Sequence, residues 1–459
     1  MDFDLLIRQG TIVDGSGMPG YRADVGIRDG LIAEIGHLAA KSAARSIDAG
    51  GLVVSPGFID IHTHLDAQMF WDPYGTCEPQ HGMTTVVMGN CGLTLAPVTD
   101  SSREDLVASL TRVEAIPRPA LEAGVPWGWH TYGDYLDALE GRVGINVGGL
   151  VGHVALRHYV MGADSLEREA TEAEVERMKE LVRGSLRGGA LGLSTNRNER
   201  HFREDGRPVA SRVASEEEIL SLGDVLRELN SGIILFSAGP SLAMLDQAAR
   251  RIERPVVWQN ILHYWHRPTE WREKLNAIGA TFRDGYRAYA MCDTQPTLRV
   301  FNMKNTQRFD EFPTWKTLGF LPEQARKQAM QDESSRAKMR AELDEDRLTT
   351  FHRRWDLVDV TKVSKPESQR FLGKSVQDMA AMRSQHPVDA FLDLSLEEDL
   401  EAEFETTNSN GDPEAMGEIM RSPHTLIGLS DAGAHVQYQA GYGFSTELLG
   451  RWVRERGVL

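Results

Sequence analysis

From residue 57 onward, short apolar runs rich in β-branched residues alternate with longer stretches whose apolar positions recur at helical spacing. Such alternation is typical of α/β folds, in which amphipathic helices cover buried parallel strands. Eight strand-like runs predict a (β/α)8 TIM barrel over residues 57–459. The runs are Phe58–Ile61, Thr84–Met88, Ile145–Val151, Ala190–Leu193, Ile233–Phe236, Val256–Leu262, Tyr286–Met291 and Leu426–Leu429.

Residues 1–56 show a different rhythm, in which short β-rich runs follow one another with only turns between them. Asp29-Gly30 separates two of these runs and is a strong signal for a β-hairpin. The pattern predicts a small β module placed before the main domain.

Helix starts and one long insertion complete the outline of the chain. Thr171-x-x-Glu174 and Ser215-x-x-Glu218 have the form of capping boxes that open two helices. Residues 293 to about 385 are charged and helical in pattern, and they are far longer than a usual connection between elements. We predict an insertion over the mouth of the barrel. The alternative is a helical decoration away from any site.

The first strand-like run ends in His62-Thr63-His64. In an extended strand, side chains two residues apart lie on the same face, so both imidazoles can hold one metal ion. In a barrel of this class the chemistry lies at the strand ends, which is where these histidines fall. The alternative is a strand end with two solvated histidines.

Further candidate metal ligands and catalytic residues follow other strand-like runs. Cys91 follows the second run and as a thiolate is a good zinc ligand, although a small buried apolar role is the alternative. His153 follows the third run and can bind a substrate carbonyl or oxyanion, or serve structurally. His263 follows the sixth run and is a candidate metal ligand. Asp431 follows the eighth run, where a carboxylate can both touch a metal and accept a proton from water.

Charge and cysteine content restrict the classes of partner and the cellular compartment that we expect for this protein. The formal net charge of −17 disfavours nucleic acid and anionic membranes as partners. Three scattered cysteines do not suggest a disulfide framework. The N-terminus lacks the pattern of a signal peptide, and no run approaches the ~20 apolar residues of a membrane span. We therefore expect a soluble, cytoplasmic protein.

Several stretches together resemble the amidohydrolase superfamily. Residues 57–64 are similar to its first-strand metal motif, and residues 430–433 are similar to its eighth-strand aspartate motif. The closer resemblance is to the N-acyl-D-amino-acid deacylase (D-aminoacylase) branch. The segments that carry this closer resemblance are residues 64–68, 70–73, 82–92 and 150–153.

The resemblance implies a barrel flanked by a small β-sandwich, to which residues 1–56 contribute. It implies one or two divalent metal ions, usually zinc, and hydrolysis of an amide next to a carboxylate in a small-molecule substrate. Carried over by position, His62, His64 and Cys91 match metal ligands, and Asp431 matches the catalytic aspartate, which also touches the metal.

Two features differ from that branch. It usually has histidine ligands at the ends of the fifth and sixth strands, whereas this chain has Ser237 after the fifth run and only His263 near the sixth. Members also continue well beyond position 459, with strands that complete the sandwich. Because unpaired strand edges are unfavourable, we expect oligomer contacts or a second chain carrying the missing portion to complete the module.

Two other functions fit the same residues. The barrel can hydrolyse a different bond, such as that of a cyclic imide or amide, a carbamate, a urea or a lactone. It can also be a non-catalytic barrel that serves as a binding or structural subunit, which the missing fifth-strand ligand and the short C-terminus favour.

Overall fold

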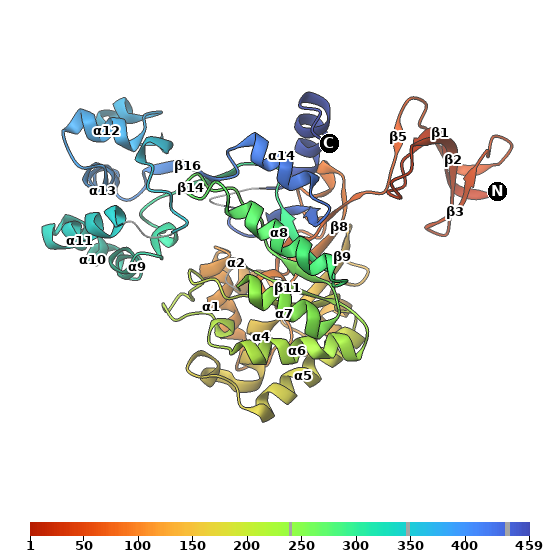
Figure 1. The fold of residues 1–459 in the computed structure, drawn as a ribbon, viewed down its shortest axis with the longest axis horizontal. Helices are drawn as coiled ribbons and strands as arrows, with labels where there is room; N and C mark the ends of the chain where they lie inside the picture. Colours follow the sequence, from red (N-terminus) through yellow and green to blue (C-terminus); the bar gives the residue numbers. More distant parts are fainter. Residues whose placement is uncertain (238–240, 346–348, 437–440) are drawn as a thin grey trace. The chain divides into compact units, whose positions relative to one another are not determined.

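The computed structural model describes residues 1–237, 241–345, 349–436 and 441–459 (Figure 1). The chain divides into two compact units, Met1–Phe58 and Ile59–Leu459. Each unit is described by itself.

The N-terminal unit is one mixed β-sheet. Its strand order is β3-β2-β1-β4, with β5 also paired to β1. The β1–β2 and β2–β3 pairs are antiparallel, whereas β4 and β5 run parallel to β1. Two small apolar clusters hold the sheet together, one around Phe3 and Leu6 and one around Ile12 and Val25. The strands are β1 (Phe3–Ile12), β2 (Tyr21–Arg28), β3 (Leu31–Gly36), β4 (Ala43–Asp48) and β5 (Val53–Val54).

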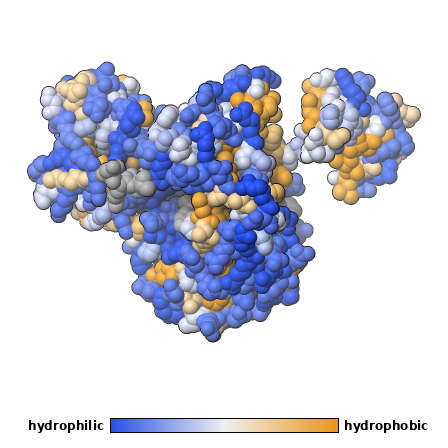
Figure 2. Space-filling view, in the orientation of Figure 1, coloured by the Kyte–Doolittle hydropathy of each residue, from blue (hydrophilic) through white to orange (hydrophobic). Residues whose placement is uncertain are grey.

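Apolar side chains of this sheet remain in contact with solvent and contribute orange patches to its surface in Figure 2. On the edge strand β3, Leu31 is 72% exposed and Ile32 is 65% exposed. Val53 on β5 is 63% exposed. The module predicted as part of a sandwich is thus a single sheet with uncovered apolar positions, and its completion by further strands or a partner stays a prediction.

The second unit is built on an eight-stranded sheet, which confirms the predicted α/β barrel class. Its strand order is β17-β13-β12-β11-β10-β9-β8-β6, and the pairs from β8–β9 through β13–β17 are parallel. Leu150, Leu235, Val257 and Met291 from its strands form an apolar cluster with Leu429 of β18 (Leu429–Ala432). The strands are β6 (Phe58–Asp60), β8 (Met83–Met88), β9 (Asn146–Gly152), β10 (Gly192–Thr195), β11 (Ile233–Phe236), β12 (Val256–Trp258), β13 (Ala288–Cys292) and β17 (Thr425–Ile427).

The first and last strands of this sheet meet through their short continuations. β7 (His62–Thr63) pairs in parallel with β18 (Leu429–Ala432). Between them, the Ile61 amide donates to the Gly428 carbonyl at 2.8 Å. The sheet therefore closes on itself, and closure brings the chain around His62 beside the chain near residue 431.

Helices α4 to α8 follow one another around the outside of the barrel, each packed against the next (Figure 1). Within the described residues, no helix is both long enough and apolar enough to cross a bilayer. The barrel helices are α1 (Arg103–Val113), α2 (Arg118–Gly124), α3 (Tyr132–Leu139), α4 (His153–Met161), α5 (Glu172–Arg187), α6 (Glu216–Glu228), α7 (Leu242–Ile252), α8 (Glu270–Arg283), α14 (Pro413–Arg421) and α15 (Phe444–Glu447), the last continuing as a π-helical segment, Leu448–Glu455.

The two predicted capping boxes differ in the structure. At the start of α5, Thr171 and Glu174 form both reciprocal hydrogen bonds, as predicted. At the start of α6, the Ser215 hydroxyl accepts from the Glu218 amide, but the return bond is missing. The Glu218 carboxylate instead contacts His153 and Arg157, so the prediction of a second full box was wrong.

Between β13 and β17 lies a segment with its own small core. Three antiparallel strands in the order β14-β16-β15 pack with helices around Phe309, Trp315 and Phe391. The strands were not predicted, because the charged helical pattern dominates this part of the sequence. The elements are β14 (Thr297–Phe301), α9 (Pro313–Gly319), α10 (Glu323–Gln331), α11 (Glu333–Asp344), β15 (Val358–Lys362), α12 (Val376–Arg383), α13 (Pro387–Glu397) and β16 (Glu403–Ser409).

Candidate metal centre

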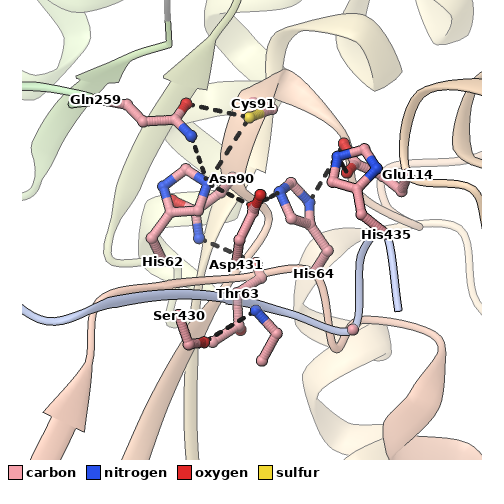
Figure 3. A network of polar contacts seen from close by, with 12 residues as sticks. His62, Thr63, His64, Asn90, Cys91, Glu114, Gln259, Ser430, Asp431 and His435 are labelled. Carbon is pink, nitrogen blue, oxygen red and sulfur yellow. Dashed lines mark hydrogen bonds and ion pairs between the residues drawn. The ribbon is translucent and has the colours of Figure 1, made fainter. Parts of the chain in front are cut away.

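His62, His64 and Cys91 gather at one end of the barrel with their side chains pointing toward one another (Figure 3). Their potential donor atoms all lie within 4.8 Å of one another, and all three residues are buried. Two imidazole nitrogens and a thiol sulfur are donors that zinc prefers. The donor set therefore fits a divalent ion of this kind.

The histidine pair is positioned by strand geometry, as the sequence predicted. Both residues follow β6, and the Asp60 carboxylate accepts a hydrogen bond from the His62 amide at 3.1 Å. Thr63, between the histidines, turns the other way and donates its hydroxyl to the Val87 carbonyl at 3.0 Å. Alternation along the strand thus sends both imidazoles to one side.

Cys91 reaches the group because the chain turns sharply after β8. Gly89 has a φ of +73° and Cys91 a φ of +56°, so both lie in the left-handed region. The Gly89 amide donates to the Asp66 carboxylate at 3.0 Å, and the Asn90 side-chain amide donates to the Thr63 carbonyl at 3.1 Å. These bonds tie the turn to the chain that carries the histidines.

Replacing Gly89 with alanine is expected to destabilise the barrel by at least about 2 kcal/mol, through left-handed strain and overpacking. A Cβ at this position would lie 2.1 Å from the Leu150 carbonyl oxygen. Gly141→Ala is the matched control, because Gly141 has a φ of +69° but no atom within 4 Å of its added Cβ. Urea unfolding of both variants measures the difference, and equal losses would contradict the packing argument.

Asp431 lies between the two imidazoles (Figure 3). Its Oδ1 is 3.3 Å from His64 Nε2 and 3.6 Å from His62 Nε2. Burial raises the pKa of this carboxyl, but the hydrogen bond and charge of His64, with the charges of His435 and His62, outweigh it and hold the pKa well below its usual range. The side chain is 15% exposed, so the ionised carboxylate is available to a bound molecule.

Burial also shifts the pKa values of the other three side chains. It lowers the pKa of His62 to about 3 and raises the pKa of the Cys91 thiol. Burial alone would lower the pKa of His64, but the neighbouring Glu114, Asp431 and Cys91 outweigh burial and raise this pKa well above its ordinary value. Two adjacent imidazoles therefore have opposite protonation tendencies.

Gln259 belongs to the same group, although the sequence analysis missed it. Its Oε1 accepts from the Cys91 thiol at 3.3 Å, and its Nε2 is 3.2 Å from His62 Nε2. The signal was its position: strand β12 ends at Trp258, so Gln259 is the first residue after the strand. The predicted sixth run extended to Leu262, four residues beyond the end of the strand, and it therefore favoured His263 over Gln259.

The structure does not bring His153 or His263 to this group. Both ring nitrogens of His153 have other partners, with Nδ1 2.9 Å from the Thr195 hydroxyl and Nε2 2.8 Å from Glu218. His263 Nε2 lies 4.0 Å from Asp412. His153 begins helix α4, and its ring extends toward α6 and not toward the candidate metal ligands.

A cavity of about 430 Å³ opens onto the group. This volume is within the range of small-molecule sites, which is roughly 300–1,000 Å³. Its lining combines the candidate metal ligands with charged side chains from the barrel loops and from the segment between β13 and β17. The charged residues are Glu114, Glu199, Arg200, Arg267, Asp293, Arg299, Arg308, Glu311 and Asp431.

Residues 45–459 match the sequence pattern of the amidohydrolase family. The match covers most of the chain, and it agrees with the barrel and with the cluster of candidate metal ligands. This protein therefore belongs to the amidohydrolase family.

Three known proteins are similar to this chain. An uncharacterised protein of Mycobacterium tuberculosis is 32% identical over 486 residues, which covers 98% of this chain and 77% of that protein. D-aminoacylase of Alcaligenes xylosoxydans xylosoxydans is 38% identical over 218 residues, covering 47% of this chain and 41% of that enzyme. The crystal structure of N-acyl-D-glutamate deacylase from Bordetella bronchiseptica, complexed with zinc and a phosphonate inhibitor, superimposes with a TM-score of 0.67 at 24% identity. It covers 100% of this chain and 82% of that one. The last likeness shows a shared fold.

Proposed function

We propose that this protein is a metal-dependent hydrolase that cleaves the amide bond of a small N-acyl amino acid. The observation that carries the proposal is the position of Asp431. Its carboxylate lies 3.3 Å from His64, beside three buried donors that suit zinc, and it lines a cavity of small-molecule size.

His62, His64 and Cys91 would hold the ion, with Asp431 beside it. When bound, such an ion polarises the acyl carbonyl and lowers the pKa of water, which makes hydrolysis feasible at neutral pH. Zinc is the preferred candidate, because the donor set combines imidazole nitrogen with sulfur. A site with one or two divalent ions fits this proposal.

Asp431 is the proposed general base and general acid. Its carboxylate lies beside the proposed ligands and its side chain is 15% exposed, so it can accept a proton from the attacking water as the hydroxyl adds to the acyl carbon. It then gives this proton to the leaving nitrogen as the carbon–nitrogen bond breaks. The products are a carboxylic acid and a free amine, which accounts for all atoms of water and amide.

The substrate class is supported by the relatives and by the cavity. D-aminoacylase and N-acyl-D-aspartate deacylase are among the similar proteins, and both names describe removal of an acyl group from an amino acid. Within the described residues, the cavity-lining guanidinium of Arg299 has no hydrogen bond or ion pair. A guanidinium is a strong partner for the carboxylate that an N-acyl amino acid carries.

Metal removal is expected to abolish turnover, and zinc is expected to restore it. The test is elemental analysis of the purified protein, followed by chelation, then assay of N-acyl amino acids of both configurations with detection of free amine and free acid. Chelation withdraws the ion that activates water, so the residual rate should fall to background. Absence of bound metal, with no gain on adding zinc, manganese or cobalt, would contradict the proposal and favour a non-catalytic binding protein.

A further inference from the structure

Glu114 is a buried carboxylate on the far side of His64 from Asp431 (Figure 3). It follows the last residue of α1, and only 1% of its side chain is exposed. Its Oε1 lies 3.5 Å from His64 Nδ1, and its Oε2 lies 3.5 Å from His435 Nε2. Neither the family resemblance nor the strand-end reasoning pointed to this residue.

Two of the atoms that face each other have no other partner in the described part of the chain. His64 Nδ1 and Glu114 Oε1 are both buried, and neither makes a hydrogen bond of ordinary geometry. A buried polar atom left without a partner costs free energy, so each such atom calls for an explanation. When the His64 ring carries its proton on Nδ1, this atom can donate to Glu114 Oε1 across 3.5 Å, and each atom then has a partner.

The carboxylate is not needed to hold the local chain together. The backbone already does this, because the Glu114 amide donates to the Leu110 carbonyl at 3.0 Å and the His435 amide donates to the Glu114 carbonyl at 2.7 Å. Burying a charged group is costly unless the group is paired, and only 1% of the Glu114 side chain is exposed. An apolar side chain would fill the same space at lower cost.

We propose that Glu114 is a positioning residue that accepts the Nδ1 proton of His64 and so fixes the tautomer and orientation of its ring. The Nε2 atom, which lies 3.3 Å from Asp431 Oδ1, is then left unprotonated on the side of Cys91 and Asp431, where the ion is proposed to bind. Carboxylates that bond the second nitrogen of a ligating histidine orient the ligand and strengthen its binding to the metal. The inference rests on the proposed function, since it assigns Glu114 to the same metal group.

The test is the zinc affinity of Glu114→Met, measured by competition with a chromogenic chelator. Methionine is close to glutamate in length and apolar, so the space stays filled while the acceptor is lost. The affinity should fall about 10- to 100-fold, as it does when such supporting residues are removed. Glu114→Gln keeps a neutral acceptor oxygen and should lie between the wild type and the methionine variant.

A control separates this role from the general effect of losing a buried carboxylate. Glu398 is also buried, at 2% exposed, but its carboxylate accepts from the Ser364 amide and hydroxyl at 2.6 Å, far along the chain from the candidate ligands. Glu398→Met should leave zinc affinity within threefold of the wild type.

The outcomes are distinct. A loss of zinc affinity that is smaller in Glu114→Gln than in Glu114→Met, with Glu398→Met unchanged, supports the proposal. Affinity of Glu114→Met within threefold of the wild type overturns it, as does an equal loss in Glu398→Met. If Glu114→Met does not fold, Glu114→Gln decides by the same threefold limit. Wild-type protein that binds no zinc overturns the proposed function and this inference with it, and that result appears before any substitution is made.

Discussion

Replacement of Asp431 by asparagine is expected to lower turnover about a thousandfold, because general acid–base groups contribute about 10²- to 10⁴-fold. Asparagine has nearly the same shape but cannot accept the proton of water or pass it to the leaving nitrogen. The fold should persist, since the backbone bonds of β18 do not involve the carboxylate. Steady-state kinetics with the best substrate of the panel measures the loss, and elemental analysis checks that the metal remains.

Asp293→Asn is the matched control for that experiment. Asp293 lines the same cavity, but among the described residues its Oδ1 accepts hydrogen bonds from the Thr294 and Gln295 amides alone, at 2.6 and 3.1 Å. An asparagine oxygen can accept the same two bonds, so this variant should keep most of its turnover. A rate for Asp431→Asn within tenfold of the wild type would rule out the proton-transfer role.

Replacement of Cys91 by alanine is expected to weaken zinc binding by more than the ~100-fold that loss of a supporting residue can cost. The reason is that a sulfur donor of the proposed site disappears, and zinc binds thiolate strongly. Turnover should fall in parallel and recover only in part at high zinc concentration. Equilibrium dialysis against a zinc buffer, together with turnover at several zinc concentrations, measures both effects.

Cys292→Ala controls for the loss of a buried thiol. Cys292 ends strand β13 and is as inaccessible as Cys91, with burial raising the pKa of its thiol above 9. It is not part of the candidate metal group among the described residues. Its replacement should leave zinc affinity unchanged. Equal zinc binding by both variants would remove Cys91 from the proposed ligand set.

The features that the sequence predicted are those set by local periodicity. The eight apolar runs correspond to the strands of the barrel sheet, because barrel strands are covered by helices on one side and by the barrel core on the other and are therefore largely apolar. His62 and His64 share one face for the same reason, since strand alternation is a property of neighbouring residues. The structure accordingly brings this pair together with Cys91.

The features that the sequence did not predict depend on contacts between distant segments. Glu114 comes from the end of α1, and nothing in its neighbourhood indicates that it faces His64. His153 does follow a strand, but helix α4 begins at that residue and directs the ring to Glu218. Strand-end position alone therefore does not decide which way a side chain points.

Closure of the barrel has a consequence for when the proposed metal site can form during folding. The pairing of β7 with β18, and the hydrogen bond from the Ser430 amide to the Asp60 carboxylate at the end of β6, join segments that are about 370 positions apart in the chain. Pairing of such remote segments carries a large loop-closure cost and is expected late in folding. During synthesis on the ribosome, the histidines emerge long before the aspartate that completes their surroundings. The proposed metal site can therefore form in full only after the last strands of the barrel have paired with the first, and a nascent chain that stops short of them is expected to gain no activity from added metal.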